Sequence, residues 1–135
     1  MNYEAEGTAC DENFGDECDG MGECAAVDAW APLPTSGAPS PRNNHSAVWT
    51  GAYMVVWGGR TGPGQYTNTG YRYSPASDTW QAISTTGAPS ARHQHEAVMA
   101  SGKMVVWGGF GSSGLLTDGG IYDPSTDTWS SMSSS

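Results

Sequence analysis

The stretch SGAPSPRNNHSAVWTGAYMVVWGG at residues 36–59 returns fifty residues later as TGAPSARHQHEAVMASGKMVVWGG at 86–109. A second pair follows in the same order, with TGYRYSPASDTW at 69–80 and DGGIYDPSTDTW at 118–129. Chance does not produce two matched pairs of this length in a chain of 135 residues. The chain therefore contains an internal repeat of about 50 residues, a period typical of solenoids and propellers.

Each repeat has the pattern of four short strands. HSAVWTG and HEAVMAS alternate in polarity and lead to tight turns at Thr50-Gly51 and Ser101-Gly102. YMVVWGG and KMVVWGG are nearly continuous apolar runs, as expected for strands buried on both faces. A third strand, GYRYSP or GIYDP, ends in a turn, and a fourth begins at a tryptophan. Four short antiparallel strands in about 50 residues predict one blade of a β-propeller.

The residues at the strand ends resemble the kelch-repeat family. A double glycine ends the second strand, a tyrosine lies in the third, and a tryptophan opens the fourth. The motifs MVVWGG, Y-x-P-x-x-D-T-W and G-A-P-S-x-R are similar to motifs of secreted bacterial kelch proteins. The resemblance covers about residues 28–132 and implies an all-β fold with two four-stranded antiparallel kelch blades. The matching residues are Gly58, Gly59, Tyr73 and Trp80, then Gly108, Gly109, Tyr122 and Trp129.

These residue types have structural roles that follow from their chemistry. Paired glycines let the backbone bend where neighbouring blades crowd together. Tyrosine and tryptophan supply large faces to bury between blades. Asp78 and Asp127 directly precede Thr-Trp and are expected to accept hydrogen bonds from turn amides, as in an Asx turn. None of these roles identifies a ligand.

The expected organisation is an acidic cysteine-rich segment at 1–27 and propeller blades at 28–135. Within the blades we expect a strand at 28–35, blade 1 at about 44–85 and blade 2 at about 94–133. DAWAPLPT at 28–35 resembles a fourth strand, and in kelch proteins such a strand commonly completes the last blade.

Two blades leave open edges, and propellers typically have 4–8 blades. The second blade already has its own fourth strand at Trp129. The sequence therefore favours a portion of a longer propeller over a homo-oligomer that closes the ring, because no motif indicates a symmetric interface.

The net charge of −9 lies in the first thirty residues. Residues 1–30 hold nine acidic residues and no Lys or Arg, whereas five acidic and five basic residues cancel from residue 31 onward. Binding to nucleic acid requires a positive surface that neutralises phosphates, so we expect no nucleic-acid partner. No stretch approaches the roughly 20 apolar residues that span a bilayer, so we expect no membrane insertion.

The acidic segment carries the cysteines Cys10, Cys18 and Cys24. It resembles short motifs ending in CDG-x-G-x-C that precede repeat domains in secreted myxobacterial proteins, although a second cysteine expected between Cys10 and Cys18 is absent. Three cysteines permit three single pairings. We favour a Cys18–Cys24 disulfide because the intervening glycines allow a tight loop. The resemblance implies an extracellular or cell-surface location, although no secretion signal is visible.

No metal or cofactor is expected. Zinc would need a histidine beside the three thiolates, and none precedes His45. The acidic residues before Cys24 do not have the spacing of an EF-hand loop, so a solvated acidic segment is the simpler interpretation, with a looser calcium site as the alternative.

The histidines and the fold analogy do not indicate catalysis. His45 and His95 occupy the same repeat position, which favours packing or turn bonding, because a catalytic residue need occur only once. His93 and His95 would share a strand face, with metal binding as the alternative. The copper radical oxidase of this fold needs two tyrosines, two histidines and a cross-linked cysteine, and no motif reproduces that set. We expect no catalytic residue, with part of such an oxidase as a distant alternative.

A binding site is expected on one rim of the blades. In a four-stranded meander, the connections after strands two and four share one edge. That rim carries 59–70 and 109–119, which differ between repeats, and the stretches APSPRNNH and APSARHQH. Variable loops on a rigid frame are where function tends to lie. The candidate contact residues are Arg42, Arg60, Tyr66, Arg92, Phe110, Leu115 and Leu116.

Two kinds of partner fit this rim. A glycan needs stacking aromatics, which only Tyr66 and Phe110 supply, and a protein needs a wider apolar patch. The alternatives are solvated loops, arginines paired with neighbouring aspartates, and a purely structural or assembly unit. The expected function is therefore a non-catalytic module that binds protein or carbohydrate.

Overall fold

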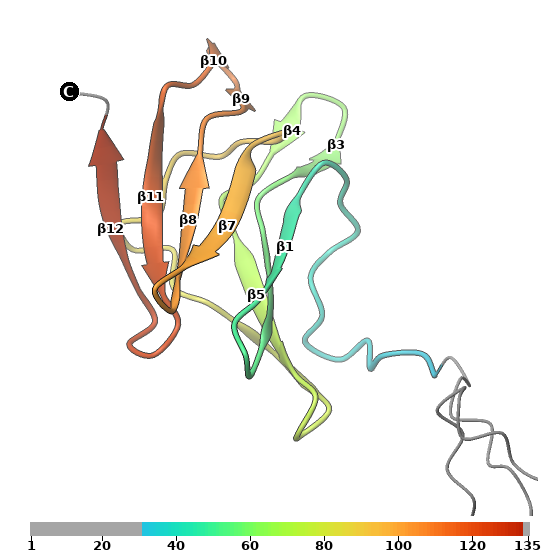
Figure 1. The fold of residues 1–135 in the computed structure, drawn as a ribbon. Coiled ribbons are helices and arrows are strands. Elements are labelled where there is room, and N and C mark those ends of the chain that lie inside the picture. Colours follow the sequence, from blue (N-terminus) through green and yellow to red (C-terminus); the bar gives the residue numbers. More distant parts are fainter. Residues whose placement is uncertain (1–30, 134–135) are drawn as a thin grey trace, which may run out of the picture. The chain divides into compact units, whose positions relative to one another are not determined.

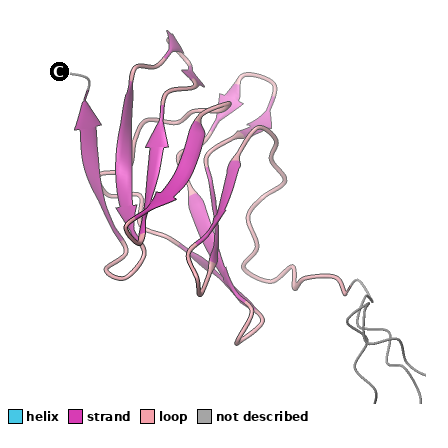
Figure 2. Ribbon diagram, in the orientation of Figure 1, coloured by secondary structure: helices cyan, strands magenta, loops and turns pink. Residues whose placement is uncertain are grey.

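A computed structural model describes residues 31–133, which form two four-stranded antiparallel sheets, two short hairpins and no helix (Figures 1 and 2). The fold class predicted from the repeat, two blades of a partial propeller, is confirmed. Blade 1 contains β1 (Ser46–Trp49), β2 (Met54–Trp57), β5 (Gly70–Ser74) and β6 (Thr79–Ala82), in that order across the sheet. Blade 2 contains β7 (Glu96–Ala100), β8 (Lys103–Trp107), β11 (Asp118–Asp123) and β12 (Thr128–Ser133), in that order.

The two rim loops are more regular than their sequences suggest. The first contains the hairpin β3 (Arg60–Gly62) and β4 (Gln65–Tyr66), and the second contains β9 (Phe110–Gly111) and β10 (Gly114–Leu115). Single β-bridges tie each hairpin to the chain ahead of its blade, Asn43 to Arg60 and His93 to Phe110. Both hairpins lie at the same end of the sheets (Figure 1). The rim is therefore a set of braced hairpins.

Residues 31–35 correct the prediction of a strand at 28–35, because they form no strand. Pro32 and Pro34 have no N–H to donate to a ladder, which explains the irregular backbone here. Residues 28–30 and the proposed Cys18–Cys24 disulfide lie outside the described residues.

The hydrophobic core lies between the two blades. Blade 1 contributes Val55 and Trp57 and the following Ile83, and blade 2 contributes Met104, Val106, Tyr122 and Trp129. The ring of Trp57 meets Trp129 at a centroid distance of 5.3 Å and His95 at 5.0 Å. The two blades therefore stabilise one another by burying one face of each sheet.

The aspartates before Thr-Trp bond differently from the prediction. Asp78 accepts a hydrogen bond from the Tyr73 hydroxyl at 2.6 Å, and Asp127 accepts one from the Tyr122 hydroxyl at 2.7 Å. Each tyrosine is the ladder partner of the tryptophan that follows its turn, so the hydroxyl comes back to the aspartate. Asp127 also accepts the amide of Ser84 at 2.9 Å. The expected bonds to amides of the aspartate's own turn are replaced by side-chain and inter-blade bonds.

Candidate interaction site on the rim

Three aromatic rings from both blades meet at the rim. Tyr66, at the end of the first hairpin, stacks on His93 with 4.7 Å between centroids and 15° between planes. His93 in turn lies 6.1 Å from Phe110, which opens the second hairpin. We refer to Tyr66, His93 and Phe110 as the rim stack. Backbone bonds from Gly59 N to Arg92 O at 2.8 Å and from Arg92 N to Thr67 O at 3.3 Å fasten the blades together beside it.

Two of the three arginines predicted to contact a partner, Arg42 and Arg92, instead donate hydrogen bonds to backbone carbonyls of the rim. Arg42 Nη1 donates to the carbonyls of Gly58 and Thr69 at 3.1 and 3.0 Å. Arg92 Nη1 makes the equivalent bonds to Gly108 and Asp118 at 3.0 and 2.8 Å. Each guanidinium thus ties the two ends of its hairpin-bearing connection together.

Arg92 is fully buried, and its Nη2 also lies 2.8 Å from Asp118 Oδ1. The prediction that Arg92 contacts a partner is therefore wrong, and the alternative of an arginine paired with a neighbouring aspartate describes it. Arg42 is half-buried, and that burial lowers the pKa of its guanidinium from the ordinary value.

Arg60 and Arg42 lie in a shallow depression of about 330 Å³ on the outer side of the first hairpin. Arg60 is half-buried, and its Nε has no hydrogen-bond partner among the described residues. That Nε is shielded from solvent, but the guanidinium forms no ion pair among the described residues, so its charge is available to an acidic group of a partner. Of the predicted arginines, Arg60 is thus the one that remains suited to contact.

The second hairpin presents two apolar side chains. Phe110 and Leu115 are ladder partners, so their side chains lie on the same face, and they are 44% and 68% exposed. Leu116 differs from its neighbour, because it is half-buried and its Cδ1 would lie 3.2 Å from a Cβ placed on Gly111. Phe110 and Leu115 are therefore available for contact, whereas Leu116 supports the hairpin.

The histidines separate into different environments. His95 is buried, its Nε2 lies 2.9 Å from Ser46 Oγ, and its ring packs on Trp57, whereas His93 belongs to the rim stack. The expected shared face of His93 and His95 is wrong, because Gln94 between them has a φ of 53° and breaks the alternation of the strand. Residues 31–133 contain no group of three or more His, Cys, Asp or Glu arranged to hold a metal.

His93 is the rim residue that sequence reasoning did not select. Its position holds Asn43 in the first repeat, so it varies between repeats as the hairpins do. That variation is the signal that could have found it.

We expect His95 to make the fold sensitive to mild acid. Burial, and then the nearby charge of Arg92, lower the pKa of His95 to about 4. Between about pH 6.5 and that value the unfolded chain binds a proton that the folded chain does not, so stability falls as pH is lowered. Urea unfolding at pH 7 and pH 4.5 measures the loss. His95→Gln should show a smaller loss over this interval, and an unchanged loss would mean that other groups cause it.

The fold and the rim define a class of protein, a partial β-propeller with braced hairpins on one rim. The KLHDC2/KLHL20/DRC7 Kelch-repeats domain matches residues 25–135, and the chain therefore belongs to this kelch-repeat family. Kelch-repeat domains generally mediate protein interactions. A search of curated proteins gave no match. The residues that the structure describes include no helix long and apolar enough to cross a membrane.

Proposed function

We propose that this chain is a non-catalytic protein-binding module whose contact surface is the rim formed by the hairpin β9–β10 and the rim stack. The observation that carries the proposal is the exposed pair of Phe110 and Leu115 on a hairpin that a β-bridge from Phe110 to His93 ties to the chain ahead of blade 2. Apolar side chains presented on a rigid frame bury area on binding with little loss of conformational entropy.

The geometry of the rim stack favours a protein over a glycan. A sugar stacks on the free face of an aromatic ring, but one face of Tyr66 is already covered by His93 at 4.7 Å. Phe110 is left as the more accessible ring of the stack, and its ladder partner Leu115 extends the surface as an apolar patch. Arg60 adds a cation at the edge of this surface, as in protein interfaces with an apolar centre and a polar rim.

The proposed setting is the outside of a bacterial cell or its surface. The support is the acidic, cysteine-bearing segment at 1–27 and the similarity of the repeat motifs to those of secreted bacterial kelch proteins. Disulfides persist in such oxidising surroundings. Alkylation of the three cysteines with and without reductant tests this setting, because three free thiols in the protein as isolated from its source would contradict it.

The double variant Phe110→Ala/Leu115→Ala should lose at least tenfold in partner capture. Residues that anchor an interface commonly lose more than 1 kcal/mol each on truncation to alanine. The measurement is quantitative mass spectrometry of proteins retained from source-cell fractions by the immobilised chain and by the variant.

Ser77→Ala/Thr79→Ala is the matched control, because it also truncates two exposed side chains but at the turn between β5 and β6, away from the rim. Capture that is equal for the double variant and for the unaltered chain would remove this hairpin from the site. A second candidate function, an assembly unit, is favoured by a separate observation, the two open blade faces described below.

A further inference from the structure

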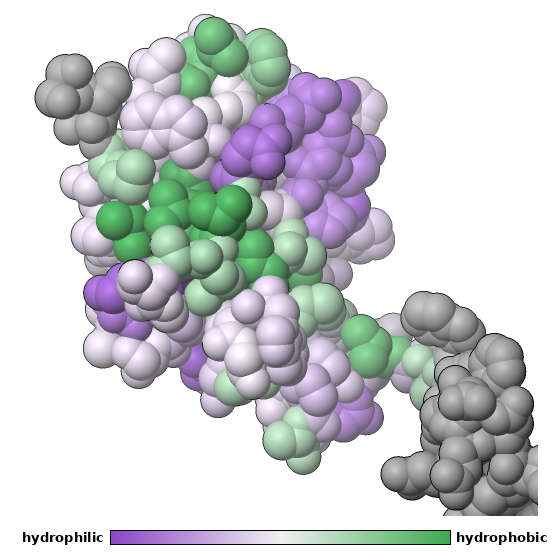
Figure 3. Space-filling model, in the orientation of Figure 1, coloured by the Kyte–Doolittle hydropathy of each residue, from purple (hydrophilic) through white to green (hydrophobic). Residues whose placement is uncertain are grey.

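The two blades have similar sequences, but they differ in which of their sheet faces is covered by a neighbouring sheet. Trp57 and Trp107 end the same MVVW strand in the two repeats. Trp57 is fully buried against blade 2, whereas Trp107 is 38% exposed. Val98 on the neighbouring strand is exposed as well. Hydrophobic surface gathers over β7, β8 and β11 in Figure 3. We refer to the side of blade 2 that presents Val98 and Trp107 as the Trp107 face. It has the apolar composition of a buried interface, but no other sheet among the described residues covers it.

The contact between the blades shows what such a face receives. Trp57 packs on His95 and Trp129 of the next blade. Below the rings, the amide of Ser84 donates to Asp127 at 2.9 Å, and Trp129 Nε1 donates to the carbonyl of Ser84 at 2.9 Å. The interface therefore combines apolar packing with a reciprocal pair of hydrogen bonds at its edge.

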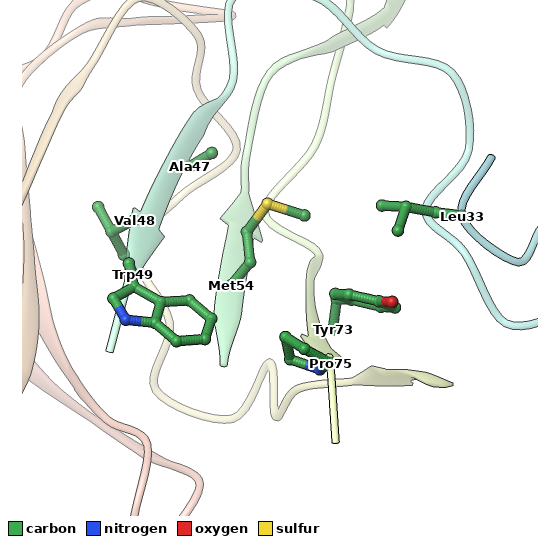
Figure 4. Close-up of a pocket in the computed structure, with 7 residues that line it drawn as sticks. All are labelled: Leu33, Ala47, Val48, Trp49, Met54, Tyr73 and Pro75. Atoms are coloured by element: carbon green, nitrogen blue, oxygen red, sulfur yellow. The ribbon is translucent and has the colours of Figure 1, made fainter. Parts of the chain in front are cut away.

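The opposite side of blade 1 carries the equivalent of the surface by which blade 2 contacts blade 1. Ala47, Trp49, Met54 and Tyr73 line an apolar groove of about 440 Å³ (Figure 4). Their equivalents in blade 2 are Ala97, Met99, Met104 and Tyr122, which pack in the core between the blades. This groove is the surface that the repeat uses to receive the preceding blade.

Two polar groups beside the groove also lack the partners that their equivalents have. Trp80 Nε1 is buried with no hydrogen-bond partner among the described residues, whereas its equivalent Trp129 donates to Ser84. His45 is exposed, whereas its equivalent His95 is buried and bonded to Ser46. Trp80 Nε1 is already shielded from solvent within the described residues, so His45 is the polar group here that remains open to an occupant.

We propose that the Trp107 face of one chain docks in the blade 1 groove of a second copy, head to tail, and so repeats the contact between the two blades. Trp107 then packs on His45 and Trp80 of the second copy. The exposed groups of the two faces then make the contacts that their equivalents already make between blade 1 and blade 2.

Charge supports a second copy as the occupant. In the blade contact, Ser46 is the ladder partner of Trp57 and bonds His95. The equivalent ladder partner of Trp107 is Glu96. Docking therefore places the acidic side chain of Glu96 opposite the imidazole of His45, a pair of complementary groups at the edge of the interface.

Residues 33–35 do not reproduce the contacts of residues 83–85 in the next blade. Leu33 occupies the repeat position of Ile83 and lines the groove, but it is 45% exposed where Ile83 is 5% exposed. Pro34 occupies the position of Ser84 and has no N–H to donate to Asp78.

Head-to-tail contacts form rings if the rotation closes. Since propellers typically have 4–8 blades, two to four copies of a two-blade chain complete a ring. The expected mass is a discrete multiple of 14.1 kDa.

Two blocking variants test the proposal by complementation. Trp107→Glu places a charge on one face, and Trp49→Glu places a charge in the groove; both side chains are exposed, so the fold should survive. Each variant alone should run as a monomer of 14.1 kDa in size-exclusion chromatography with light scattering. Their equimolar mixture should form a one-to-one dimer, because one intact face of each kind remains.

Ser113→Glu at the exposed tip of the second hairpin is the charge-matched control and should keep the mass of the unaltered chain. Near-ultraviolet circular dichroism checks the packing of each variant, and Val98→Glu replaces Trp107→Glu if that protein is unfolded. Association that survives in either single variant, or a mixture that stays monomeric, would overturn head-to-tail docking. A monomeric unaltered chain at all concentrations up to about 100 μM would overturn the second copy and leave both faces to other blades.

Discussion

Replacement of Trp57 by alanine lowers the free energy of unfolding by about 4 kcal/mol, the middle of the range for burying and then deleting a large aromatic side chain. Trp57 is fully buried and touches His95 and Trp129, so its removal leaves a cavity at the centre of the contact between the blades. Because the rest of both sheets supports this contact, collapse of the cavity is limited. Urea unfolding followed by circular dichroism measures the change.

Trp107→Ala is the matched control within the same repeat motif. Trp107 is 38% exposed, so its truncation should cost about 1 kcal/mol or less when unfolding is measured at low protein concentration. Equal losses for the two tryptophans would mean that the two sheets are not packed as in this structure. A larger loss for Trp107 only at high protein concentration would agree with docking between chains.

Arg92→Ala has the second largest expected effect, a loss of about 3 kcal/mol, because it deletes a fully buried side chain and leaves its partly buried acceptors without a donor. The fully buried guanidinium donates to the carbonyls of Gly108 and Asp118 and to the Asp118 carboxylate. Arg92→Lys should recover only part of this stability, since a single ammonium does not reproduce the planar fork of donors. Thermal and urea unfolding of both variants measure the losses.

Arg42→Ala is the control for Arg92. Arg42 bonds the equivalent carbonyls of Gly58 and Thr69 but is half-buried, so water can replace part of the lost bonding and the loss should be smaller. If both variants lost the same stability, burial would not be the reason for the importance of Arg92.

The four strands of each blade could be predicted from the sequence because their signals are local. Apolar runs such as MVVW, alternation before a Gly-containing turn, and a tryptophan after Pro-x-x-Asp-Thr depend on residues a few positions apart. The strand at 28–35 was predicted by analogy with a repeat, and prolines at 32 and 34 outweigh that analogy where the structure describes it.

The rim site was predicted only in outline. The sequence located it on the variable connections, since those connections differ while the scaffold repeats. It did not distinguish Arg92, which is buried, from Arg60, which is half-buried, because both are arginines in the same kind of stretch. It also missed His93, whose stacking partner Tyr66 is far away in the sequence and belongs to the other blade.

The sequence by itself determined the all-β class, the presence of two repeated blades and the positions of the four strands within each, because repeated short-range patterns specify them. Only the tertiary structure decided which members of each repeated pair are buried. Trp57 and Trp107, or His95 and His45, occupy identical places in their own repeats and differ because a blade covers one and not the other. The burial of a residue depends on the neighbouring sheet as much as on the residue itself. Packing between sheets determines which sheet becomes that neighbour.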